Sequence, residues 1–141
     1  MRNTANEVGR IARLLQREIN ESVLPAGVTR QQYQILSYIC RSKEDVFQRD
    51  IEAYYAMPRS TVSGLMKDLE TAGLIRRCQV ESDSRLKRLE LTDKGQGVCR
   101  MVRKGMVDLN EQLTGGISDE EFSVFWQVAD KMRANLAQAQ A

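Results

Sequence analysis

The segment Arg76–Gly95, which reads RRCQVESDSRLKRLELTDKG, concentrates side chains that can bind an anion. Two arginines precede its polar centre, Glu81–Ser84, and Arg85, Lys87 and Arg88 follow that centre closely. Guanidinium and ammonium groups bind phosphate oxygens, and arginine in particular is attracted into the minor groove of DNA. The residue types therefore predict binding of a nucleic acid rather than covalent chemistry.

Asp83 lies two residues before Arg85, at the expected tip of a β-hairpin. The plainer interpretation of Arg85 is a solvated hairpin charge. We favour a guanidinium held in place by the neighbouring carboxylate, ready for a minor groove, with Lys87 beside it on the same hairpin.

The segment just upstream, QRDIEAYYAMPRSTVSGLMKDLETAGLI, predicts two short helices, Gln48–Tyr55 and Arg59–Thr71, joined at Met57-Pro58. The second helix has inward-facing apolar residues at helical spacing: Val62, Leu65, Met66 and Leu69. Its outer face is polar or small: Arg59, Ser60, Thr61, Ser63, Gly64 and Lys67. We expect Arg59 and Lys67 to contact phosphates, and the three hydroxyl residues to face bases or to cap the helix.

Positive charge is concentrated in the middle of the chain. The net charge is only +2 over 141 residues, but residues 59–104 hold 11 Lys and Arg against 6 Asp and Glu. That segment is therefore +5 and the remainder −3, which indicates an anionic partner for the middle segment. A solvated basic face is the alternative that charge alone leaves open.

Several classes of protein are disfavoured. Histidine is absent, and the sequence has no nucleophile elbow, Walker loop or GxGxxG motif, so we expect neither an enzyme nor a metal or other cofactor. No apolar run approaches the roughly 20 residues that span a bilayer, and no signal peptide is evident, so we expect a cytoplasmic protein without membrane contact.

The three cysteines, Cys40, Cys78 and Cys99, are odd in number and widely spaced. This pattern favours reduced, partly buried thiols over a disulfide framework or a zinc site. A redox switch is the alternative, with Cys78 favoured because Arg76 and Arg77 lie beside it.

The flanking elements predict how these residues are positioned. We expect helices over 4–23, from Thr29 onward, from Thr92 to about 113, and after Ser118, with strands over 74–80 and 86–91. In the second of these helices, Tyr33, Leu36, Ile39 and Cys40 form the expected apolar face, and Ile51, Tyr54 and Tyr55 are the apolar contacts of helix 48–55. Most of the aromatic residues are interpreted as core, and the lining of an effector cavity is the alternative for each of them: Tyr33, Tyr38, Tyr54, Tyr55 and Trp126.

The predicted order is four helices, two strands and two helices, a mainly α fold with a small β-hairpin wing. This is a winged helix-turn-helix. Wide apolar stripes on the first and last helices predict a dimer, although packing on their own domain is the alternative. We expect an N-terminal dimerisation helix over 1–28, the winged DNA-binding domain over 29–104 and C-terminal dimerisation helices over 105–141.

Three motifs together resemble the multiple-antibiotic-resistance regulator (MarR) family of bacterial transcription factors: STVSGLMKDLETAGLI, D-S-R at 83–85 and LTDKG at 91–95. The resemblance implies a winged-helix homodimer with helix 59–72 in the major groove. It also implies a wing arginine in the minor groove and release from DNA by a small, often aromatic or phenolic, effector. Arg85 matches the wing arginine and Asp83 the acid that holds it, while Ser60, Thr61, Ser63 and Lys67 match DNA-facing positions. Ser84 and Gly64 depart from the family pattern, which often has larger or basic residues there.

The sequence thus predicts a homodimeric transcriptional regulator, a repressor, that binds double-stranded DNA at a pseudo-palindromic operator. A winged-helix protein-interaction module without DNA binding is the alternative.

Overall fold

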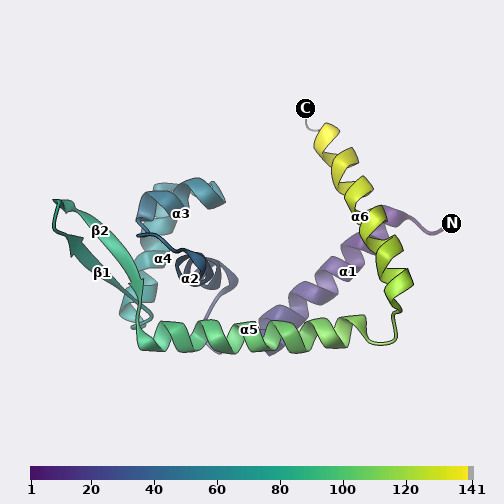
Figure 1. Ribbon diagram of the computed structural model, residues 1–141, viewed down its shortest axis with the longest axis horizontal. Helices are drawn as coiled ribbons and strands as arrows, with labels where there is room; N and C mark the ends of the chain where they lie inside the picture. Colours follow the sequence, from purple (N-terminus) through teal and green to yellow (C-terminus); the bar gives the residue numbers. More distant parts are fainter. Residues whose placement is uncertain (140–141) are drawn as a thin grey trace. The chain divides into compact units, whose positions relative to one another are not determined.

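The computed structural model describes residues 1–139 and contains the helices and strands in the expected order (Figure 1). The chain divides into two compact units, Met1–Leu109 and a second that begins at Asn110. The elements are α1 (Thr4–Glu18), η1 (Ile19–Val23), α2 (Arg30–Arg41), α3 (Gln48–Tyr55), α4 (Arg59–Thr71), β1 (Ile75–Val80), β2 (Asp83–Leu91), α5 (Asp93–Thr114) and α6 (Asp119–Gln138). The fold is therefore a mainly α winged helix-turn-helix, as predicted.

Side-chain caps begin three of the helices at the predicted residues. The Thr29 hydroxyl accepts from Gln32 N at 3.2 Å, and the Gln32 side chain accepts in turn from Thr29 N. Ser118 and Glu121 form the same reciprocal pair at the start of α6. The Thr92 hydroxyl accepts from Gly95 N at 3.1 Å at the start of α5. Each pair satisfies backbone N–H groups that the first helical turn leaves without partners.

The first predicted helix is only partly α-helical. It ends at Glu18, and Ile19–Val23 form a π-helical turn. A π turn accommodates an extra residue per turn and so changes the direction of the side chains that follow it. Val23 is buried there, against Val102 and Leu109 of α5.

The main core of the first unit lies among α2, α3, α4 and the hairpin. Six fully buried side chains fill its centre: Ile35, Leu36, Ile51, Val62, Met66 and Leu69. The predicted apolar face of α2 was wrong at Cys40, which is exposed, and it omitted Ile35. Tyr54 was also expected to be covered but is 62% exposed, because it lies on the outer side of α3, edge-on to the rings of Tyr38 and Tyr55.

The wing is a two-stranded antiparallel sheet in which Ile75 pairs with Leu91 and Val80 with Asp83, with an irregularity at Gln79 and Val80. β2 begins at Asp83, so the polar turn is shorter than the predicted 81–84. Leu89 N donates to Val46 O at 2.8 Å, which attaches the hairpin to the loop before α3.

The second unit consists of the end of α5 and of α6. Within the described residues, α6 has no buried side chain, and Phe125 and Trp126 are 55% and 57% exposed. The interpretation as a core residue is therefore wrong for Trp126. In the described part of the chain, no helix combines the length and apolar character needed to cross a lipid bilayer.

Candidate nucleic-acid interface

The start of α4 is an exposed helix N-terminus without a side-chain cap. Its N-cap is Pro58, whose carbonyl accepts from Val62 N at 3.1 Å, and no acidic residue lies in the first turn. The backbone N–H groups of the first turn and the positive end of the helix dipole are thus free to attract an anion. Arg59, Ser60 and Thr61 are all exposed around this end.

The remaining predicted residues of α4 are placed differently from one another. Lys67 is exposed, two turns further along the helix. Ser63 is half-buried, because Gln48 Nε2 donates to its hydroxyl at 2.8 Å and to Glu52 Oε1 at 2.9 Å. Ser63 therefore does not lie on the free outer face and instead connects α3 to α4.

At the wing tip, the side chain of Arg85 is 92% exposed. The Arg85 N–H donates to Asp83 Oδ1 at 2.9 Å, and the Arg85 Nε lies 3.9 Å from the same oxygen. Asp83 thus holds the backbone of Arg85 firmly and its guanidinium loosely. The guanidinium stays free to bind elsewhere.

A cavity of about 470 Å³ lies between the start of α4 and the wing tip. It is bordered by α3, the start of α4 and the hairpin, and its basic lining residues are Arg49, Arg59, Arg77, Arg85 and Lys87. Glu52 is the one acidic residue among its lining residues in the described chain. Like charges that gather in a concave surface reinforce their potential, so this cavity is an anion-attracting site.

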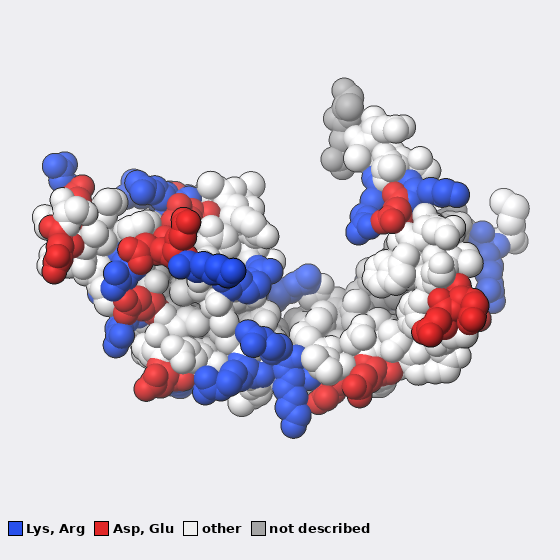
Figure 2. All heavy atoms as spheres, viewed as in Figure 1, with Lys and Arg blue, Asp and Glu red and all other residues white. Residues whose placement is uncertain are grey.

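Arg49 was missing from the predicted site, and for Arg77 the sequence left phosphate contact and a solvated strand charge as equal alternatives. Arg77 Nε pairs with Glu70 of α4 at 3.3 Å, and the Arg49 guanidinium lies 5.2 Å from the centre of the Phe47 ring. Charge counting over residues 59–104 excluded Arg49, and only the packing of α3 beside the wing brings it to the cavity. On the face drawn in Figure 2, Lys and Arg atoms lie at the wing tip and beside α3, with acidic atoms between them.

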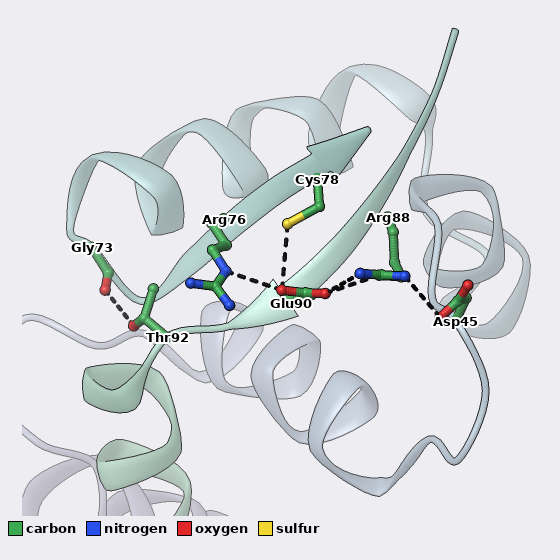
Figure 3. Close-up of polar contacts among 7 residues, drawn as sticks. All are labelled: Asp45, Gly73, Arg76, Cys78, Arg88, Glu90 and Thr92. Atoms are coloured by element: carbon green, nitrogen blue, oxygen red, sulfur yellow. Dashed lines mark hydrogen bonds and ion pairs between the residues drawn. The ribbon is translucent and has the colours of Figure 1, made fainter. Parts of the chain in front are cut away.

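Glu90 anchors the base of the wing (Figure 3). Its carboxylate accepts from Arg76 Nε at 3.0 Å, from Arg88 Nε at 2.9 Å and from Cys78 Sγ at 3.3 Å. Arg88 also lies 3.6 Å from Asp45 in the loop before α3. Hydrogen bonds from Arg76 above all, then from Arg88 and Cys78, lower the pKa of Glu90 to about 2. Arg76 and Arg88 are therefore occupied in positioning the hairpin.

The end of the wing is attached to α4 by Thr92 and Gly95. The Thr92 hydroxyl donates to Gly73 O at 2.6 Å (Figure 3). The Thr92 N–H also donates to Leu74 O, at 3.1 Å. A Cβ atom at Gly95 would lie only 2.1 Å from Leu74 O. The glycine of LTDKG is thus required by the close approach of the first turn of α5 to the chain leaving α4.

Comparison with known proteins agrees with this geometry. Residues 26–86 match the model of the MarR family. Over these residues the chain is similar to the MarR family. The HTH-type transcriptional regulator YwoH of Bacillus subtilis (strain 168), itself uncharacterized, is 28% identical over 124 residues, covering 88% of this chain and 89% of the relative.

Two solved structures share the fold over most of the chain. A mutant of S. aureus MepR aligns with a TM-score of 0.85 at 22% identity, covering 96% of this chain and 99% of that one. The transcriptional regulator SlyA aligns with a TM-score of 0.72 at 28% identity, covering 98% and 96%. YwoH and SlyA, to which this chain is similar over most of its length, are both transcriptional regulators.

Proposed function

We propose that this chain is a cytoplasmic, homodimeric repressor that binds a pseudo-palindromic operator in double-stranded DNA and is released by a small-molecule effector. The observation that carries the proposal is the basic cavity between α3, the uncapped start of α4 and the wing. A mutant of S. aureus MepR bound to an oligodeoxyribonucleotide shares the fold with a TM-score of 0.72.

In this proposal α4 lies in the major groove, and its first turn receives a phosphate at the exposed N–H groups. Arg59 and Lys67 bind phosphates, and Ser60 and Thr61 face base edges. Arg85, held by Asp83 and joined by Lys87, enters the flanking minor groove. Ser63 acts through its contact with Gln48, which sets the position of α4 against α3.

Exposed apolar side chains on the terminal helices support a dimer. Val8, Ile11 and Leu14 of α1 are about half exposed, and so are Val124, Phe125 and Trp126 of α6. Monomeric proteins seldom leave such stripes in water, and a second copy of the chain is the partner that a symmetric operator requires. Two α4 helices about 34 Å apart would then contact successive major grooves.

An effector site is supported by a second cavity, of about 680 Å³, which is bordered by α2, the base of the hairpin and α5. This volume is within the range of small-molecule sites. S. aureus MepR has been solved bound to ethidium bromide, and PcaV of Streptomyces coelicolor with its natural ligand. Some dimer conformations would hold the two α4 helices at a spacing that does not fit DNA. An effector that binds such a conformation more tightly than the DNA-binding one would weaken DNA binding by that difference in affinity.

The test is fluorescence anisotropy of the purified protein on the intergenic DNA beside its own gene, over a salt series and against scrambled duplex. We expect tighter binding to the native duplex and a steep fall in affinity with salt, because several phosphates are neutralised. The proposal would be refuted if the protein binds weakly and shows no preference over scrambled duplex, both for this DNA and for genomic fragments selected with the protein. That result would favour a protein-interaction module. Analytical ultracentrifugation tests the dimer independently.

A further inference from the structure

The side-chain amide of Gln48 has both of its hydrogens engaged. Gln48 is the first residue of α3, and its Nε2 donates to Glu52 Oε1 at 2.9 Å and to the Ser63 hydroxyl of α4 at 2.8 Å. A carboxylate only accepts hydrogen bonds, so the amide nitrogen, and not the amide oxygen, must face Glu52. The two contacts therefore fix the amide in one orientation, with Oε1 turned away from Glu52.

The amide oxygen of Gln48 is an unused acceptor at the basic cavity. The hydrogen bonds among the residues that the structure describes use the nitrogen of this amide and leave its oxygen without a donor. The described chain contains no buried side-chain N or O atom that lacks a partner, so Oε1 is open to solvent. Gln48 lines the 470 Å³ cavity together with Arg59 of α4. The cavity thus presents a neutral acceptor beside its cations.

The chemistry of this acceptor decides which part of DNA it can bind. Phosphate oxygens accept hydrogen bonds, so they pair with the cations of the cavity and not with Oε1. In the major groove, adenine and cytosine present amino groups, which donate, whereas guanine and thymine present carbonyl oxygens, which accept. An acceptor at Gln48 therefore distinguishes amino bases from keto bases.

We propose that Gln48 is a specificity-determining residue that accepts a hydrogen bond from the amino group of adenine or cytosine in the major groove, with Glu52 as the residue that positions its amide. This inference rests on the proposed DNA binding, and it adds a base contact from α3 to those assigned to α4 and the wing. A glutamine with a free amide accepts from adenine N6 and donates to N7, which selects adenine alone. In this chain the nitrogen is occupied, so adenine and cytosine should bind almost equally well.

The first experiment uses duplexes that the wild-type protein selects from a random library, with affinities measured by fluorescence anisotropy after each base is placed in turn at every position. We expect one position in each half-site where adenine and cytosine bind about five-fold more tightly than guanine and thymine, which is the effect of one hydrogen bond. Gln48→Ala should lose that preference and keep those at the other positions. Gln31→Ala is the matched control, because Gln31 is exposed on α2 and does not line the basic cavity.

Two results of this experiment have different meanings. If the wild-type protein selects a sequence and Gln48→Ala keeps every base preference, this inference alone is overturned. If the wild-type protein selects no sequence, the proposed function is overturned and the inference with it.

Base analogues test the orientation of the amide in the unaltered protein. Replacing adenine at this position by purine removes the N6 amino group, and replacing it by 7-deazaadenine removes the N7 acceptor. The first change should lower affinity about five-fold, and the second should leave it unchanged because the Gln48 nitrogen is not free to donate. An equal loss for both analogues would show that the amide also donates to the base, and would overturn the role as an acceptor only.

Glu52→Gln tests the positioning role with a measurement that a general loss of stability does not change. A side-chain amide both donates and accepts, so the Gln48 amide can then turn either its oxygen or its nitrogen towards the DNA. The ratio of affinities between amino and keto bases at this position should fall from about five towards one. Removal of a negative charge beside the cavity strengthens binding to all duplexes alike, so it cancels in this ratio. An unchanged ratio would overturn the role given to Glu52.

Discussion

Replacement of Gly95 by alanine tests the junction between the wing and α5. The new Cβ would lie 2.1 Å from Leu74 O and 3.1 Å from the Leu74 carbonyl carbon, both backbone atoms. A carbon and a carbonyl oxygen normally approach no closer than about 3.3 Å, so the two segments must separate by about 1.2 Å. That movement also lengthens the hydrogen bond from Thr92 N to Leu74 O beyond its 3.1 Å.

The expected net loss is about 1–3.5 kcal/mol in the free energy of unfolding. Overpacking against fixed atoms costs about 1–3 kcal/mol and a lost hydrogen bond about 1 kcal/mol, while alanine returns about 0.5–1 kcal/mol of helix preference. Gly97→Ala is the matched control in the same helix, because its Cβ would have only the flexible end of Arg100 nearby, at 3.8 Å. This control should gain about 0.5–1 kcal/mol.

Urea denaturation followed by circular dichroism, at one protein concentration, measures both variants. The reasoning requires a lower midpoint for Gly95→Ala and a higher one for Gly97→Ala, at unchanged m-value. Equal stability of the two variants would show that the Leu74 carbonyl moves away without cost, and that the glycine is not needed for close approach.

Four further variants test the proposed interface and its support. Arg85→Ala should weaken operator binding by about 1–3 kcal/mol, measured by anisotropy with Arg17→Ala as the control, and leave the fold intact. A Cβ at Gly64 would meet nothing within 4 Å, so Gly64→Ala should raise stability by up to about 1 kcal/mol. The same variant should weaken DNA binding, because the proposal places α4 close to the DNA, and tighter binding would contradict that placement. Lys67→Ala should weaken binding to all duplexes alike and reduce the salt slope by about 1, and loss at a single base position would exclude a phosphate role. The lowered pKa of Glu90 contributes stability that is present above about pH 4.5 and is lost as the pH falls towards 2. Glu90→Gln should therefore make the free energy of unfolding depend less on pH in that window, as measured by urea denaturation at stepped pH.

Local sequence signals located most of the elements correctly. The bounds of α3 and α4 were predicted to the residue, and the caps at Thr29, Thr92 and Ser118 form the expected hydrogen bonds. These features depend on neighbours three or four positions apart, which the sequence displays directly. The LTDKG glycine was visible as a motif, but its reason, the Leu74 carbonyl, was not.

What remained beyond the sequence depends on contacts between distant segments. The π-helical turn at Ile19–Val23 arises where Val23 packs against α5, and local periodicity does not encode that contact. The place of Ser63 follows from Gln48 on another helix.

The sequence by itself determined the order of the elements, the wing and most basic residues of the proposed interface, because helical periodicity, caps and charge are properties of short stretches. Only the tertiary structure decided which cations share one cavity and which are bound by Glu90. Arg49 lines the same cavity as the wing arginines, and Arg76 and Arg88 are bound to Glu90, because packing sets distances between side chains that the order of residues leaves free.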